Sequence, residues 1–230
     1  MAEIDVCNFA LCLLQGAINT DVPLLASWDE EETSQTALPT LRFFKACYPR
    51  AIRKMQSRWP FPECERFPIL GAALDSASAV DVPDWDYVYN KPSDCIAFWG
   101  VVSNDIDLNN GEWTEYPFYE AGGQIACNVT NSDDDDPGYR FHVNVLVENT
   151  GLWSEELFQV TAHLLAMYTC RPLGGTMENQ ALIKGLYDNA WSEAKAAIQA
   201  RKFQVTRRSQ TGDSVEVAPG IVDYKFPQPC

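Results

Sequence analysis

Residues 139–168 read YRFHVNVLVENTGLWSEELFQVTAHLLAMY, and the spacing of apolar side chains changes within this stretch. From Tyr139 to Val147 every second residue is aromatic or valine. Strict alternation over such a length is typical of a β-strand with one buried face. This stretch decides the fold because it begins as a strand and a helical pattern follows it.

A buried helix is expected over residues 154–170. Ser154 is a suitable N-cap, and Glu155 and Glu156 stand in the first turn, where the helix dipole favours acidic side chains. The residues that follow are apolar nearly all round. Such a pattern is typical of a helix that other elements enclose.

A second helix is expected directly afterwards, over residues 177–202. Pro172 and Gly174-Gly175 end the preceding helix, and Thr176 can cap the next one. The predicted buried stripe of this helix consists of Ile183, Leu186, Tyr187, Ala190, Trp191, Ala194, Ala197 and Ile198. The remaining sequence is polar with scattered prolines, so residues 204–230 are expected to form an extended arm.

Upstream of residue 139 the sequence predicts a small antiparallel sheet of about four or five strands in all. Trp85, Tyr87 and Tyr89 alternate, and Gly122-Gly123 marks a turn. The predicted strands before residue 139 lie at 85–89, 95–103, 113–119 and 124–129. We therefore expect a β insertion over about residues 85–148.

Two helices are predicted before the sheet. The first covers residues 3–15, with Gly16 placed to end it. The second covers residues 37–58 and has an apolar stripe at intervals of three or four residues. Pro49 lies inside this pattern, so we expect a kink or a break there.

Together these elements predict an α+β fold. Its N-terminal and C-terminal helices form one helical bundle, with the small antiparallel β-sheet inserted between them. Residues 1–203 are expected to form this domain, and residues 204–230 the extended C-terminal arm.

The second predicted helix has a basic face opposite its apolar stripe. It carries Arg42, Lys45, Arg50, Arg53, Lys54 and Arg58. Two interpretations are open: a surface that meets another subunit or DNA, or a solvated face whose cations pair with nearby acids. Under the first interpretation, Arg50, Arg53 and Lys54 are candidates for a channel or ring-contact surface.

The 230-residue chain has a formal net charge of −15. A protein that holds duplex DNA needs cations to displace counterions from phosphates, so this balance argues against such binding. An acidic wall past which DNA slides is compatible with it. Because no apolar run approaches the length of a membrane span and no signal peptide is recognisable, we expect a soluble protein made in the cytoplasm, with no membrane partner.

The sequence contains no pattern that indicates catalysis. His142 falls on the polar side of the predicted strand and His163 within an apolar helix, as surface and core histidines do. Nucleophile-elbow and phosphate-loop motifs are absent, and the eight cysteines have no zinc spacing and are expected to be buried, reduced thiols, apart from an exposed Cys230. No catalytic, cofactor-binding or metal residue is assigned, and we do not expect an enzyme.

Four consecutive acids, Asp133, Asp134, Asp135 and Asp136, are followed by Pro137-Gly138. Four neighbouring carboxylates on an extended chain cannot all converge on one ion, so a solvated loop is expected. In a ring-forming protein this loop is a further candidate for the channel or ring surface. A metal-dependent nuclease that uses these acids is the enzymatic alternative.

The order of the segments resembles the tail tubular protein A family of short-tailed phages and the related head–tail adaptor proteins. Each motif alone is weak, and the resemblance comes from their order across residues 3–203. The segments that carry it are Asn8–Leu11 with Gly16, Cys47-Tyr48-Pro49, Trp59-Pro-Phe61, Trp85–Cys95, Gly122–Asn128 and the helix pair 157–172 and 186–197.

The resemblance implies a structural virion protein at the head–tail junction. Such a subunit belongs to a closed ring, expected to be dodecameric, that binds the portal protein and a tail or nozzle protein and continues the DNA channel. Duplex DNA passes through without sequence-specific binding, and no cofactor is involved. The alternatives are another neck or minor tail protein, the nuclease, and a monomeric host binding module.

The C-terminal arm has no counterpart in that family pattern. We expect it to dock on a neighbouring ring or on the portal, because an unstructured arm can order on binding and cover a large surface. The residues expected to carry this contact are Arg207, Arg208, Ile221, Tyr224 and Phe226. The alternative is a terminus with no partner.

Overall fold

The computed structural model describes residues 3–18, 23–75, 78–103, 114–131 and 138–210. The chain divides into two compact units. Met1–Cys64 and Leu146–Ile198 form the first, which we call the helical unit, and Glu65–Val145 with Gln199–Cys230 form the second, the β unit. Among the described residues, no helix combines the length and apolar character needed to cross a bilayer.

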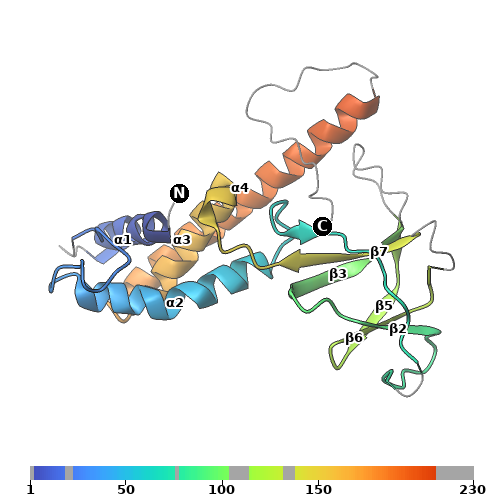
Figure 1. The fold of residues 1–230 in the computed structure, drawn as a ribbon. Helices are drawn as coiled ribbons and strands as arrows, with labels where there is room; N and C mark the ends of the chain where they lie inside the picture. The colour runs from blue at the N-terminus through green and yellow to red at the C-terminus, as the bar shows by residue number, and fades with distance from the viewer. Residues whose placement is uncertain (1–2, 19–22, 76–77, 104–113, 132–137, 211–230) are drawn as a thin grey trace. The chain divides into compact units, whose positions relative to one another are not determined.

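Helices from both ends of the sequence make up the helical unit (Figure 1). They are α1 (Glu3–Ile18), α2 (Leu38–Gln56), α3 (Glu155–Thr169) and α4 (Met177–Gln210), of which the part up to Ile198 belongs to this unit. A short 3-10 helix, η1 (Thr150–Leu152), precedes α3. The predicted α+β fold, with helices of both ends in one bundle and a β insertion between them, is therefore confirmed.

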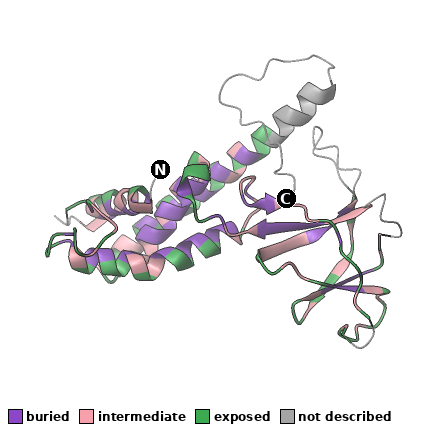
Figure 2. Ribbon diagram, in the orientation of Figure 1, coloured by how far each residue is buried: buried purple, intermediate pink, exposed green. Residues whose placement is uncertain are grey.

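The buried helix α3 packs against both α1 and α2. Its N-terminus is capped as expected, because the Ser154 hydroxyl oxygen accepts a hydrogen bond from the Leu157 N–H at 3.3 Å. Most of α3 is buried (Figure 2), which agrees with its nearly continuous apolar sequence. Burial of the apolar surface of this helix stabilises the unit.

Three predictions about the helices differ from the structure. Helix α1 continues through Gly16 to Ile18, although Gly16 was predicted to end it after residue 15. A kink or a break was predicted at Pro49. The helix does not break there, because α2 is continuous through this residue. Proline removes one backbone donor, but Pro49 lies on the exposed side of α2, where water can solvate the freed carbonyl. Helix α4 continues to Gln210, past the predicted end at residue 202. The prediction of an extended arm is therefore wrong for residues 204–210, which are helical and include Arg207 and Arg208.

Side-chain hydrogen bonds join the two points at which the chain leaves and rejoins the helical unit. The Gln56 amide donates to the Val147 carbonyl at 2.9 Å and accepts from the Val147 N–H at 2.8 Å. The Glu63 carboxylate accepts from the N–H and the hydroxyl of Ser154, at 2.8 and 2.6 Å. We call these four bonds the staple; they fix where the segment between Cys64 and Leu146 begins and ends.

The β unit contains two antiparallel sheets, where one was predicted. The first has the order β1-β7-β3-β4, with β1 (Glu65–Arg66), β7 (Tyr139–Val145), β3 (Cys95–Ser103) and β4 (Glu115–Tyr116). The second has the order β2-β6-β5, with β2 (Tyr87–Asn90), β6 (Gln124–Cys127) and β5 (Phe118–Ala121). The unit begins at Glu65 instead of about residue 85, because the two-residue strand β1 pairs with β7.

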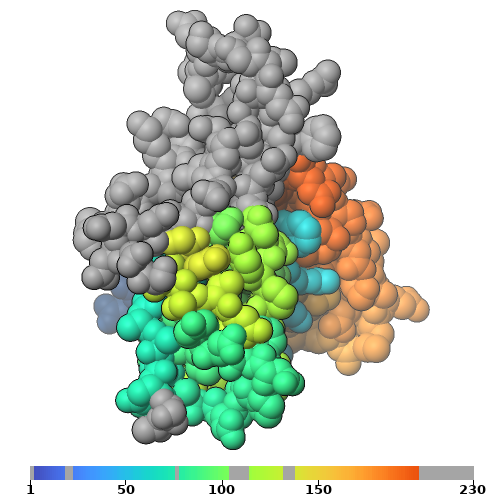
Figure 3. Space-filling view, turned by 90° about the vertical axis from the view of Figure 1, so that its right-hand side faces the viewer, coloured from blue at the N-terminus to red at the C-terminus, as the bar shows by residue number. Residues whose placement is uncertain are grey.

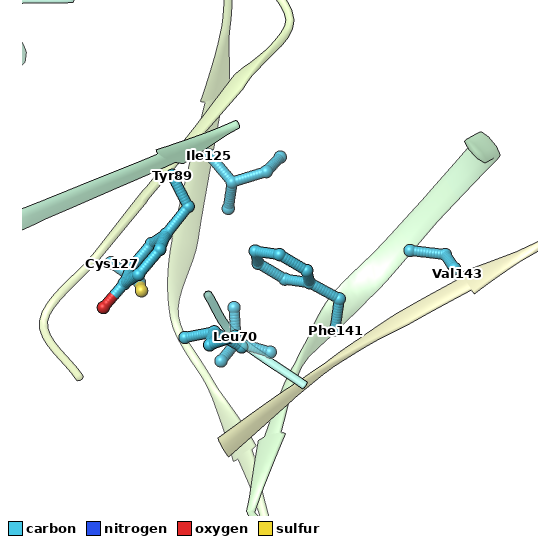
Figure 4. Packing of buried hydrophobic residues seen from close by; sticks show 7 residues of the cluster. Leu70, Tyr89, Ile125, Cys127, Phe141 and Val143 are labelled. Atoms are coloured by element: carbon cyan, nitrogen blue, oxygen red, sulfur yellow. The ribbon is translucent and has the colours of Figure 1, made fainter. Parts of the chain in front are cut away.

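An aromatic cluster forms the core of the β unit. Phe141 points toward Tyr89 and Leu70 (Figure 4), and its ring centroid lies 6.0 Å from that of Tyr89 and 5.5 Å from that of Phe98. The Tyr89 hydroxyl lies at the edge of the apolar cluster and donates a hydrogen bond to the Val129 carbonyl. In the space-filling view of Figure 3, the described residues of this unit (green to yellow) lie together in one closely packed region.

His142 on β7 is buried, so its predicted surface position is wrong. Its Nε2 lies 2.9 Å from the Glu65 carboxylate, and its ring stacks on Phe67 at a centroid distance of 4.8 Å. The reason is that β7 is an interior strand between β1 and β3, so residues on both of its faces can be covered. The alternating sequence indicated the strand correctly but not the burial of its polar side.

We predict that Gln56→Leu lowers the free energy of unfolding by about 1–3 kcal/mol, because the Val147 N–H loses its acceptor in a buried position. Chemical denaturation followed by circular dichroism measures this change. The matched control is Gln35→Leu, which alters an exposed glutamine and leaves the stability unchanged. Equal stability of Gln56→Leu and the wild type would show that the staple does not stabilise the bundle.

We predict that Phe141→Ala destabilises the β unit by about 3–5 kcal/mol, because it opens a cavity between Tyr89 and Phe98. Hydrogen exchange should rise in β3 and β7 while the amides of α3 stay protected. Tyr119→Ala serves as the control, because that aromatic residue of β5 is 50% exposed. Simultaneous loss of protection in α3 would mean that the two units unfold together.

A candidate interaction surface on α2

The outward face of α2 carries Arg50, Arg53 and Lys54, all of them exposed. We call these three residues the α2 cation row. They are exposed because the opposite face of the helix supplies the buried stripe, which is formed by Leu41, Phe44, Tyr48, Ala51, Ile52 and Met55. Helical spacing in the sequence predicted this face correctly.

The cations at the two ends of the basic face are engaged inside the helical unit. Arg42 and Lys45 approach the Glu30 carboxylate at 3.0 and 3.8 Å. Arg58 donates to the Tyr187 hydroxyl and lies 4.7 Å from the centroid of the Trp191 ring. For these residues the second interpretation of the basic face, in which cations are used within the chain, is the better one.

The α2 cation row differs from its neighbours on the same helix. Within the part of the chain that the structure describes, no carboxylate lies within 4.0 Å of Arg50, Arg53 or Lys54. Their positions three and four residues apart place like charges side by side, which destabilises a helix. The row therefore has an unused capacity to bind anionic groups.

Tyr168 of α3 provides the contact that orders part of the row. The Arg50 guanidinium lies 5.4 Å and the Lys54 ammonium 5.8 Å from the centroid of its ring. Both cations are attracted to the electron-rich face of the ring, which offsets part of their mutual repulsion. The Tyr168 hydroxyl is buried and has no hydrogen-bond partner among the described residues, so its aromatic ring is the part that does the positioning.

The chemistry around the row favours binding over catalysis. Cys47 is on the same side of α2; burial raises the pKa of its thiol, and the nearby Arg50 charge only partly opposes this effect. A thiol with a raised pKa remains protonated near neutral pH and is a poor nucleophile. The arrangement can hold phosphate or carboxylate groups, but it supplies no activated nucleophile.

Other reactive side chains of the described chain are engaged in structure. The buried Glu65–His142 pair lies under Phe67, and the His163 ring nitrogen Nδ1 approaches the Gln159 carbonyl at 2.8 Å. Within the described residues there is no group of three or more His, Cys, Asp or Glu side chains arranged to hold a metal ion.

Seven of the cysteines are described, and all seven are free thiols. Burial, as predicted, holds for Cys7, Cys64, Cys127 and Cys170, whereas Cys47 and Cys95 are half-buried. For Cys12 the prediction is wrong, because this residue lies on the exposed side of α1. Burial raises the pKa of both the Cys7 and the Cys127 thiol, so these two residues act as apolar packing groups.

Several predicted site residues lie outside the part of the chain that the structure describes. They are Asp133, Asp134, Asp135, Asp136, Ile221, Tyr224 and Phe226. Cys230, which was predicted to be an exposed thiol, lies outside it as well. Arg207 and Arg208 lie within α4, in a segment whose side chains are not described. The roles proposed for these residues in ring or portal contacts stay predictions.

One exposed feature was missed in the sequence. Leu186 was placed on the buried stripe of α4, but it is 38% exposed, and Leu182 is 55% exposed. The stripe that is buried runs through Ile183, Tyr187, Ala190, Trp191, Ala194 and Ile198. The spacing of four residues between the two leucines was the signal that could have indicated a second apolar face.

No model of a protein family matches this sequence, and no curated protein sequence matches it either. The assignment of a function therefore depends on the residues and contacts described above.

We predict that Tyr168→Phe raises the free energy of unfolding by about 1 kcal/mol, because it removes a buried hydroxyl that has no partner among the described residues. Tyr168→Leu should lower it by about 1–2 kcal/mol, because two cation–π contacts are lost. Chemical denaturation of both variants distinguishes the hydroxyl from the ring. Equal destabilisation by the two substitutions would contradict this division, and Tyr119→Phe on the exposed surface of β5 is the control.

Proposed function

We propose that this protein is a structural virion protein, a head–tail adaptor subunit that forms a ring between the portal and the tail of a phage. The ring continues the DNA channel and contains about twelve copies, as the family resemblance implies. In this proposal the protein is not an enzyme and uses no cofactor. Its partners are further copies of itself, the portal protein and a tail or nozzle protein.

The arrangement of elements supports this proposal. Motifs with the order of the adaptor family extend over residues 3–203, and the helices from both ends of this range belong to one unit. Residues 65–145 form an insertion in that unit. A bundle closed by both ends of its sequence offers flanks that neighbouring subunits can cover, as ring assembly requires.

The α2 cation row is the single observation that carries the proposal. A monomer of net charge −15 has ample carboxylates with which to neutralise its cations, yet Arg50, Arg53 and Lys54 pair with none in the described chain. A row of like charges held on a rigid helix is stabilised when another molecule provides the anions. Such a surface fits an assembly subunit better than a solitary binding module.

The charge of the inserted segment supports a role beside passing DNA rather than in holding it. Between Glu65 and Val145 the sequence has 15 acidic and three basic residues. Carboxylates repel phosphates, so a wall of this composition prevents a duplex from adhering. The three cations of the α2 row are too few to reverse this balance.

We predict that the purified protein, mixed with the portal protein of the same phage, adds an annulus beneath the portal in negative-stain electron microscopy. Rings of the protein alone would give the same support. Deleting residues 204–230 should weaken portal binding, because the arm is proposed to dock there. The matched comparison is the full-length chain at the same concentration.

Monomers that never join the portal would contradict the adaptor proposal. In that case nuclease activity should be measured with magnesium and manganese, for the wild type and for a variant with Asn at positions 133–136. Full portal binding without residues 204–230 would contradict the docking of the arm alone and leave the adaptor proposal in place.

A further inference from the structure

The outward face of α4 carries an apolar stripe bounded by acids. Leu182 and Leu186 are 55% and 38% exposed, and Glu178, Asn189 and Glu193 are exposed on the same side of the helix. We call these five residues the α4 stripe; they are separated by four, four, three and four positions, so they form one line along the helix. A single exposed leucine is ordinary, but two that are adjacent on a helix face form a patch.

The acids of the α4 stripe have no cation partner in the described chain. Lys184 on the same helix is engaged by Asp188 at 2.6 Å and leaves Glu178 and Glu193 unpaired. Glu178 in the first turn is favoured by the helix dipole, but Glu193 lies well inside the helix and gains nothing from it. The α4 stripe therefore combines exposed apolar surface with uncompensated negative charge.

The outward face of α2 has the complementary composition. Phe43 is 39% exposed, and Ala46, Arg50 and Arg53 are exposed at spacings of three, four and three residues. We call these four residues the α2 face. Its apolar part can cover the leucines of an α4 stripe, and its two cations can neutralise the two glutamates.

We infer that the α4 stripe of one copy binds the α2 face of a second copy. This inference rests on the proposed ring function and names the contact that closes the ring. The two surfaces differ, so each copy donates one and receives the other, and such a heterologous contact generates a ring when its rotation closes. The acids of the α4 stripe exclude duplex DNA as its partner, because both would be negative.

The size of the contact indicates how the ring forms. Two leucines and one phenylalanine bury little apolar area, so a single contact between two copies is weak. In a closed ring every copy contacts two neighbours at once, so a copy leaves the ring only when both contacts break. The ring is therefore more stable than a single contact between two copies. Assembly is therefore expected to be steeply dependent on concentration and favoured by the portal as a template.

Two charge-reversed variants test the contact. The first carries Arg50→Glu and Arg53→Glu, and the second carries Glu178→Arg and Glu193→Arg. In a solution of one variant alone, every contact brings like charges together. The fraction of the protein found in rings should therefore fall at least tenfold. Mixed in equal amounts, the two variants have complementary surfaces in every contact and should form a ring in which they alternate.

Alternation requires an even number of subunits, which the proposed dodecamer has. All four substitutions in one chain provide a second test, because that chain should form rings of any number by itself. Mass photometry and negative-stain electron microscopy, each with and without portal protein, report the assemblies. Arg171→Glu with Lys184→Glu is the matched control, because it reverses two exposed cations outside both surfaces and should leave assembly unchanged.

The outcomes separate this contact from the proposed function. If the wild type forms rings or joins the portal but both charge-reversed variants assemble equally well, the contact is overturned and the adaptor proposal stands. The contact is also overturned if neither the mixture nor the fourfold variant recovers assembly while circular dichroism shows native helix content. If the wild type neither forms rings nor joins the portal, the adaptor proposal itself fails.

Discussion

The bonds between Gln56 and Val147 and between Glu63 and Ser154 hold together the residues where the chain leaves and rejoins the helical unit. The rest of the structure depends on this constraint. Because α3 must lie against α1 and α2 to be buried, the chain has to return from an excursion of some eighty residues to the place where it left. The Trp153 indole, which donates to the same Val147 carbonyl, adds a further bond at this point.

The β unit begins and ends in the same way. Strand β1 pairs with β7, with Glu65 opposite Asn144, so the two ends of the insertion are neighbours in one sheet. The buried contact between Glu65 and His142 lies in the same pair of strands. The side chains of Gln56, Glu65 and His142 are thus buried near the points where the chain leaves and rejoins the helical unit, and their hydrogen bonds offset the cost of burial.

Long periodic segments could be predicted from the sequence, whereas features that depend on distant partners could not. The stripe of α2 and the cap at Ser154 follow from local spacing and were found. Strand β1 has only two residues and therefore no period, so the insertion was predicted to start too late. On α2 the sequence identified the cations, but only the folded chain shows that Glu30 reaches Arg42 and not Arg50, and that the Tyr168 ring contacts both Arg50 and Lys54. On α4, Leu186 was assigned to the core because helical spacing alone does not show which of two apolar faces packs against other elements.

The staple also has an evolutionary consequence. An insertion whose two ends are fixed at one point can lengthen, shorten or be exchanged without altering the spacing of the helices that carry it. The residues that hold the ends lie in the helical unit, at Gln56, Glu63, Val147 and Ser154, and not in the insertion itself. Selection can therefore change the surface of the β unit and its binding partners through one part of the sequence. It acts on the packing of the helices through another part.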